Sequence, residues 1–195
     1  MEQKERIMTR LIGVSGKIGS GKDTVGGVLQ LLFATHHPNG AWDIKKYAGK
    51  LKEVAEILTG IPKINFEIQQ FKNTNLPEEW NKDGEAMSVR TLLQKIGTEA
   101  LRDSLHENVW VNALFADYND SSHWIITDVR FPNEAEAIKR HGGIMLRIER
   151  DVPANNHLSE TALDDYEFDH VIHNNNSIHD LIVDVQKFAM KHKLI

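Results

Sequence analysis

Leu11-Ile-Gly-Val-Ser-Gly-Lys-Ile-Gly-Ser-Gly-Lys-Asp-Thr-Val25 is the stretch of sequence that decides the fold. Residues 9–15 predict a buried strand, and residues 16–22 follow the pattern G-x-x-x-x-G-K. Glycines in such a loop let backbone N–H groups converge on one anion, and the start of the next helix adds its own unpaired N–H groups. The stretch therefore predicts a phosphate-binding loop, with the Lys22 ammonium reaching the outer phosphates of a nucleoside triphosphate. The alternative is a purely structural glycine-rich turn.

The position after Lys22 departs from the usual pattern. Asp23 stands where Ser or Thr normally supplies a hydroxyl to Mg²⁺, and Thr24 follows one residue later. Either side chain is a candidate magnesium ligand. Asp23 is also a residue type that stabilises a helix start without binding any ligand. The sequence leaves these roles open.

Composition restricts the class of protein. The 195 residues are 41% hydrophobic and 26% charged, which suits one domain with its own core. The absence of cysteine excludes disulfides and thiolate chemistry and fits a reducing compartment. No apolar run approaches the ~18 residues that span a bilayer, and residues 1–10 are charged rather than signal-like. We therefore expect a cytoplasmic protein without membrane association.

The charge balance bears on the partners. A formal net charge of −5 argues against a nucleic-acid-binding surface, which requires clustered Lys and Arg. A small anionic ligand needs only a few cations in one cleft. The expected partners are thus small molecules and not nucleic acids, for a chain that acts as a monomer or a homodimer. The histidines show no metal-site spacing.

Strand and helix patterns alternate along the chain. Strands are predicted at residues 9–15, 42–47, 123–127, 144–148 and 171–173, and helices at residues 23–33, 48–59, 88–105, 109–118, 132–141 and 177–192. Residues 61–86 show no clear pattern. The alternation predicts an α/β fold, with a parallel sheet of about five strands covered by helices on both faces. In such folds ligands bind beyond the carboxyl ends of the strands, where the phosphate loop, Tyr47 and Lys50 are expected.

Thr127-Asp128-Val129-Arg130 follows the apolar Trp124-Ile-Ile126. The carboxylate and the guanidinium are expected at the tip of this strand, facing the phosphate loop. Asp128 is a candidate to hold magnesium through water or to accept a hydrogen bond from substrate, and Arg130 to clamp phosphoryl oxygens. An ordinary ion pair at a strand end is the alternative.

The helix predicted from Ser88 carries a second group of polar residues. Regular helical geometry places Arg90, Gln94 and Gly97 close to one line, with Thr98 beside it. Arg90 suits a phosphate, and the amide of Gln94 suits the edge of a base. A solvated polar face explains the same residues equally well.

The chain resembles the phage-type deoxynucleoside monophosphate kinases. The resemblance rests on blocks that occur in the family's order and touch most of the chain: Ser15-Gly-Lys-Ile-Gly-Ser-Gly-Lys-Asp-Thr24, Ser88-Val-Arg90, Gln94-Lys-Ile-Gly97-Thr98, Trp110, Thr127-Asp-Val-Arg130, His157-Leu-Ser159-Glu160 and Val171-Ile-His-Asn174. It implies a single P-loop kinase domain of residues 1–195, with a substrate-binding helical part at 48–118 and a short lid at 151–167. It also implies transfer of the γ-phosphoryl group of ATP to a deoxynucleoside monophosphate, with Mg²⁺.

The resemblance also implies roles for individual residues. ATP would be bound by Gly16, Lys17, Gly19, Ser20, Gly21, Lys22, Asp23 and Thr24, with Asn174 near the adenine. The monophosphate would face Lys50, Arg90, Gln94, Gly97, Thr98, Trp110 and Arg130. Independently of the resemblance, the shapes of Tyr47 and Trp110 make them candidates to pack against the sugar. Together with the residue patterns above, this gives Lys22, Asp128, Arg130 and Arg150 as the candidates for catalysis, while Asp23, Thr24 and Asp128 remain the candidate metal ligands.

The expected chemistry is direct in-line transfer without a covalent enzyme intermediate. A phage-encoded enzyme of this kind would act in the host cytoplasm. Two rival functions stay open on sequence alone: another P-loop small-molecule kinase, similar to dephospho-coenzyme A kinase or phosphomevalonate kinase, and a nucleotide-binding ATPase without a small acceptor.

Overall fold

The computed structural model describes residues 9–37, 40–119, 121–153 and 158–195. The chain divides into two compact units. Unit 1 comprises Met1–Lys46 and Tyr118–Ile195, and unit 2 comprises Tyr47–Asp117. Within the described residues, no helix is long and apolar enough to cross a membrane.

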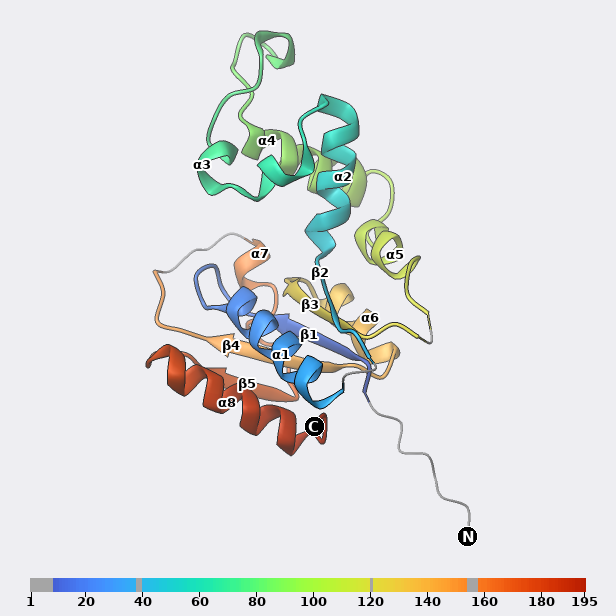
Figure 1. Cartoon of the computed structure of the whole chain (residues 1–195). Helices are drawn as coiled ribbons and strands as arrows, with labels where there is room; N and C mark the ends of the chain where they lie inside the picture. Colours follow the sequence, from blue (N-terminus) through green and yellow to red (C-terminus); the bar gives the residue numbers. More distant parts are fainter. Residues whose placement is uncertain (1–8, 38–39, 120, 154–157) are drawn as a thin grey trace. The chain divides into compact units, whose positions relative to one another are not determined.

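Unit 1 is built on a five-stranded sheet in which every paired strand runs parallel (Figure 1). The strand order is β2-β3-β1-β4-β5, which places β1 in the centre. The strands are β1 (Leu11–Ser15), β2 (Asp43–Lys45), β3 (Trp124–Val129), β4 (Ile144–Glu149) and β5 (His170–His173). This sheet confirms the predicted fold class, and it puts the loop after β1 at the middle of the edge where parallel sheets bind ligands.

Helices cover both faces of this sheet, as predicted. On one face, α1 (Lys22–His36) and α8 (Ile178–Lys191) pack together over the strands. Their apolar stripes join side chains from four of the strands in one core, which includes Val25, Leu29, Phe33, Val185, Phe188, Ile12, Val14, Ile125, Leu146 and Ile172. On the other face, α6 (Pro132–Arg140) packs against β1 and β4. The short helix α7 (Leu158–Thr161) follows the first part of the predicted lid. His157 lies outside the described residues.

The third strand is longer than predicted. Gly13 of β1 pairs with Ile126, but Ser15 pairs with Val129, so three steps along β3 face two steps along β1. This irregularity lets β3 continue to Val129. The predicted end of the strand at residue 127 is therefore wrong: Asp128 lies inside β3, and Arg130 is the first residue after it.

Unit 2 is helical. Its helices are α2 (Tyr47–Thr59), η1 (Lys63–Glu67), α3 (Gln69–Lys72), η2 (Glu78–Trp80), α4 (Val89–Gln94), η3 (Lys95–Asp103) and α5 (Val109–Phe115). Helix α2 packs against α5, α4 and η1. Residues 61–86, which gave no sequence pattern, contain three of these short helical turns, and their end is closed by a β-bridge between Asn75 and Ser88.

The long helix predicted at residues 88–105 changes type in the middle. Ser88 caps α4 as expected, accepting a hydrogen bond from the Thr91 N–H, but from Lys95 the chain continues as the π-helix η3. A π-turn holds more residues than an α-turn, so the predicted line through Arg90, Gln94 and Gly97 breaks after Gln94. Gly97 instead contacts α2, since a Cβ there would lie 3.1 Å from Leu51 Cδ2.

Candidate active site

The loop from Gly16 to Gly21 is too tightly folded for larger residues at two positions. A Cβ on Gly16 would lie 2.5 Å from the carbonyl oxygen of Ile148, which is backbone and cannot move aside. Gly21, at the start of α1, has a φ of 99°, in the left-handed region that favours glycine. The Ser20 N–H donates to Lys17 O at 3.1 Å and closes the turn. The sequence pattern thus produces a compact loop between β1 and α1.

Lys22 curls back over this loop. Its Nζ donates to the carbonyl oxygen of Lys17 at 2.8 Å. Burial and, after it, the charge of the nearby Arg130 lower the pKa of Lys22 to about 8, against the opposing effect of Glu160, Asp23 and Asp128. A lysine whose charged form is disfavoured by its surroundings gains from binding an anion.

Arg130 is held at the tip of β3 by two carboxylates. The Glu134 carboxylate accepts the backbone N–H of Arg130 at 2.8 Å and that of Phe131 at 3.2 Å. The guanidinium Nη1 pairs with Glu160 Oε1 and lies 3.3 Å from Ser159 Oγ. The second oxygen of Glu160 accepts the N–H of Ile18 in the phosphate loop at 2.6 Å. Lys22, Arg130 and the loop therefore meet in one place, as predicted.

Asn174 supports the loop from inside the protein. Its side chain is buried and donates to the carbonyl oxygen of Ser20 at 2.8 Å, and a Cβ on Gly21 would come within 2.6 Å of its Nδ2. The hydroxyl of Ser20 is fully buried and has no hydrogen-bond partner among the described residues. A buried hydroxyl without a partner is costly, and a phosphate oxygen at the loop would satisfy it.

The three candidate magnesium ligands lie at the start of α1 and in β3. Asp23 Oδ1 accepts from the Lys46 ammonium at 2.8 Å and the Thr127 hydroxyl at 3.1 Å. Burial raises the pKa of Asp23, but the bonds and charge of Lys46 outweigh it and keep the pKa below its usual value. Thr24 is exposed and Asp128 is half-buried. The hydroxyl of Thr24 and the carboxylates of Asp23 and Asp128 all offer the oxygen ligands that Mg²⁺ prefers.

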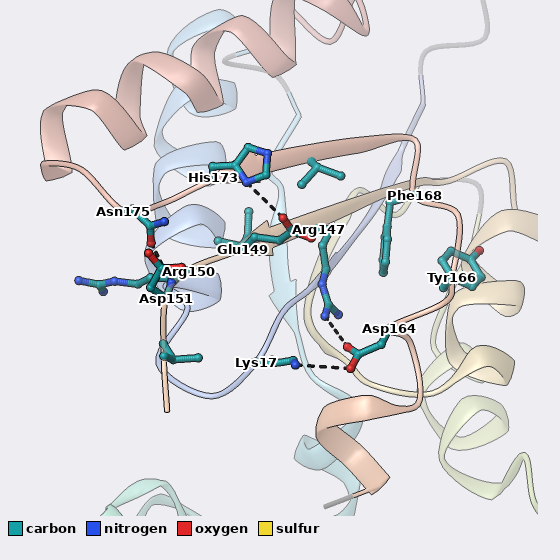
Figure 2. A pocket seen from close by; sticks show the side chains of 13 residues that line it. Lys17, Arg147, Glu149, Arg150, Asp151, Asp164, Tyr166, Phe168, His173 and Asn175 are labelled. Carbon is teal, nitrogen blue, oxygen red and sulfur yellow. Dashed lines mark hydrogen bonds and ion pairs between the residues drawn. The ribbon is translucent and has the colours of Figure 1, made fainter. Parts of the chain in front are cut away.

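The side chain of Lys17 points away from the loop into a neighbouring cleft (Figure 2). This cleft has a volume of about 590 Å³ and runs along the ends of β4 and β5. Lys17 Nζ lies 3.4 Å from the carboxylate of Asp164, whose other oxygen pairs with Arg147 at 3.0 Å. The sequence predicts that Lys17 binds the nucleotide, whereas its charge in this structure is matched by Asp164.

Arg150 lies at the rim of the same cleft, directly after β4 (Figure 2). It is exposed, with Nη1 3.5 Å from the carbonyl oxygen of Gly19. This distance places the predicted lid cation beside the phosphate loop.

Apart from Arg130, the residues predicted to bind the monophosphate belong to unit 2. Arg90, Gln94 and Thr98 are exposed, and the Arg90 guanidinium is held by Asn73 Oδ1 at 3.1 and 3.2 Å. Lys50 is paired with Asp117 at 2.8 Å. That bond is the largest effect on Lys50, and it raises the pKa of the ammonium.

Tyr47, Gly97 and Trp110 have packing roles within unit 2. Tyr47 and Trp110 are both buried. The indole Nε1 of Trp110 donates to the carbonyl oxygen of Gly97 at 2.8 Å. Since Gly97 also lies against Leu51, these residues fix the packing of α5, η3 and α2.

Three carboxylates of unit 1 received no role from the sequence. Glu134 follows Pro132 in the first turn of α6, a position that the rules for helix starts identify as a cap. Glu160 stood in a quoted block, but its partners Ile18 and Arg130 are far away in the chain. Asp164 carries no sequence signal at all. For Glu160 and Asp164 the role appears only from the tertiary contacts.

A family model described as deoxynucleotide monophosphate kinase matches residues 45–185 of the chain. The chain belongs to this family. A protein of Acanthamoeba polyphaga mimivirus, named as a proposed deoxynucleotide monophosphate kinase, is 31% identical over 186 residues, which cover 86% of this chain and 90% of the relative. The deoxynucleoside-5′-monophosphate kinase of Escherichia phage T5 is 25% identical, over 68% of this chain and 72% of the relative. The deoxynucleotide monophosphate kinase of Escherichia phage RB69 is 26% identical, over 57% of this chain and 49% of the relative.

Membership of the deoxynucleotide monophosphate kinase family makes the protein a phosphotransferase that acts on deoxynucleoside monophosphates. The predicted resemblance and the predicted enzyme class are confirmed. The family match begins at residue 45, after the phosphate loop, so it is independent of the motif that pointed to nucleotide binding.

Proposed function

We propose that the protein transfers the γ-phosphoryl group of ATP to a deoxynucleoside monophosphate, with residues 16–24 holding the phosphates of ATP. The observation that carries the proposal is the convergence of Lys22, Arg130 and the N-terminus of α1 on one compact loop. Two fixed cations and a helix start together favour the binding of an anionic group. The cationic side chains of unit 2 supply groups for the second nucleotide.

The proposed chemistry is in-line transfer without a covalent intermediate. The transition state spreads negative charge over the transferred group, so the protein's main tasks are positioning and charge neutralisation. Lys22 binds the outer phosphates, Arg130 bridges donor and acceptor phosphates, and Arg150 adds a cation from the side of the lid. Mg²⁺, when bound, supplies further neutralisation of the phosphate charge, and Thr24 and Asp128 are the residues that would hold it.

The proposed acceptor site uses the exposed polar side chains of unit 2. Arg90 binds the phosphate of the acceptor, and Gln94 pairs with the edge of its base. Thr98 is exposed in the same unit, and Lys50 becomes available when its bond to Asp117 opens. Trp110 contributes shape, because its one polar atom is already bonded to Gly97.

We further propose that the enzyme acts on small molecules in the cytoplasm, as a monomer or a homodimer. The lack of cysteine supports a reducing compartment. The acidic net charge of −5 supports small nucleotides over nucleic acids as partners.

An acceptor panel tests the proposal. ADP release from ATP is measured with each deoxynucleoside monophosphate, with ribonucleoside monophosphates, and with dephospho-coenzyme A and phosphomevalonate as controls. We expect release that depends on a deoxynucleoside monophosphate. Release that is the same without an acceptor, or only with the control acceptors, would exclude the proposed reaction.

The Arg90→Ala variant assigns the acceptor site. The KM for the monophosphate should rise at least tenfold while the KM for ATP stays within twofold, because Arg90 contacts only the acceptor. The reverse pattern would mean that the two nucleotide sites have been exchanged.

A further inference from the structure

Glu160 is a carboxylate enclosed within the phosphate site. Its side chain is only 4% exposed, whereas that of its partner Arg130 is 31% exposed. A carboxylate that only occupied the place of a bound phosphate would be exposed to solvent. Glu160 therefore belongs to the wall of the site, and the guanidinium lies between it and the solvent.

The two oxygens of Glu160 bind two different parts of the machinery. Oε2 accepts the backbone N–H of Ile18 in the phosphate loop at 2.6 Å. Oε1 pairs with Nη1 of Arg130. One rigid carboxylate thus fixes the distance between the loop and the arginine.

The pairing leaves most of the guanidinium available. Nη1 is shared by Glu160 and Ser159, but within the described part of the chain neither Nε nor Nη2 of Arg130 has a hydrogen-bond partner. Those two nitrogens form the fork with which an arginine binds phosphate oxygens in pairs. The contact with Glu160 orients this fork without occupying it.

The bond to Glu160 also has an entropic effect. A free arginine side chain has several rotatable bonds, whose freedom must be lost when the guanidinium binds a phosphate. Here the backbone of Arg130 is fixed by Glu134 and the guanidinium by Glu160. The side chain is therefore ordered before substrate arrives.

We propose that Glu160 is a positioning residue for phosphoryl transfer, which aims Arg130 at the transferred group and fixes it relative to the phosphate loop. The inference rests on the proposed function, since it assumes that Arg130 contacts the phosphates. Its effect is expected on kcat, because a misaligned arginine loses contacts that matter most in the transition state.

The test compares four variants by steady-state kinetics. Glu160→Gln keeps the shape and removes the charge, and should lower kcat at least tenfold while each KM changes less than threefold. The kcat of Arg130→Ala is the reference for the double variant that also carries Glu160→Gln. The kcat of the double variant should be less than twofold below that of Arg130→Ala, because Glu160 acts through Arg130. Asp165→Asn removes an exposed carboxylate from the same segment and should leave kcat within twofold.

Two results would overturn the proposal: a kcat within twofold of wild type in Glu160→Gln, or a full and independent loss of kcat when the variant is combined with Arg130→Ala. Thermal melting shows whether each variant is folded. If Glu160→Gln is unfolded, Glu160→Asp takes its place, since it keeps the charge but draws it back by one methylene, and the same two criteria apply. A wild-type protein without acceptor-dependent ADP release would refute the proposed function and the role of Glu160 with it, whereas an active wild type with an unaffected Glu160→Gln variant would refute the role of Glu160 alone.

Discussion

Replacing Glu134 with Ala should both destabilise unit 1 and disturb the position of Arg130. One oxygen of this buried carboxylate accepts the backbone N–H groups of Arg130 and Phe131, at 2.8 and 3.2 Å. Without it both donors lose their acceptor, at a cost of about 1–3 kcal/mol for a buried group. Because Arg130 and Phe131 are half-buried, the lower end of this range applies to the N–H group of each. The expected loss is about 2–3 kcal/mol, with a fall in Tm of about 5–10 °C.

Urea denaturation measures this loss, and Glu134→Gln separates charge from bonding. The amide oxygen of Gln still accepts hydrogen bonds, so this variant should lose only about 1 kcal/mol. Glu136, exposed on the same helix, is the matched control, and its change to Ala should cost less than about 0.5 kcal/mol. Under conditions where Glu134→Ala is folded, kcat should still fall, because the turn that carries Arg130 is no longer fixed. A loss of stability no larger than that of the control would refute the reasoning.

Three other predictions concern single residues. Lys22→Met should abolish activity and raise the Tm of the nucleotide-free protein at pH 7. Since folding lowers the pKa of Lys22 from 10.5 to about 8, this gain in Tm should shrink as the pH rises above 8. A lower Tm of the variant at pH 7 would contradict this prediction. Asp169→Asn should destabilise the protein at pH 7. Burial raises the pKa of Asp169, but bonds from Lys139 and a backbone N–H hold it below 3.8, so the difference in urea stability should vanish only as pH falls through that lowered value. Gly21→Ala should weaken ATP binding at least tenfold by calorimetry, because a Cβ would displace Asn174, and a Kd within twofold of wild type would speak against it.

The parts of the fold that local chemistry specifies were predictable from sequence. The apolar run before Gly16 and the lysine after Gly21 marked β1, the loop and α1. Ser88 and Ser177 marked two helix starts, and in both cases the hydroxyl accepts a backbone N–H of the first turn. Signals of this kind act within a few residues, so the sequence displays them directly.

The structure differs from the sequence predictions where distant parts of the chain determine the local geometry. Asp128 lies within β3 because pairing with β1 continues past an irregularity that no local pattern marks. The chain becomes π-helical after Gln94 in the region where Gly97 contacts Leu51 and accepts from Trp110. These features depend on partners 13 to 114 residues away, which periodicity along one helix or strand does not report.

The residues of the candidate site fall into the same two groups: those that the sequence identifies and those that only the tertiary contacts explain. Lys22 and Arg130 were identified from residue type and position, and the structure places both at the phosphate loop. The side chain of Lys17 turned out to face a cleft and Asp164, because its neighbours there come from a segment almost 150 residues further along the chain. Glu160 became interpretable only when the Ile18 N–H and the Arg130 guanidinium were found on its two oxygens.

The most direct test of the central claim follows the phosphoryl group itself. The protein is incubated with Mg²⁺, γ-³²P-labelled ATP and a deoxynucleoside monophosphate, and the products are separated by chromatography. We predict that the label appears on the deoxynucleoside diphosphate with the wild type and is lost with Lys22→Ala and Arg130→Ala. Label released as inorganic phosphate at the same rate without acceptor, or transfer that both variants retain, would contradict the account.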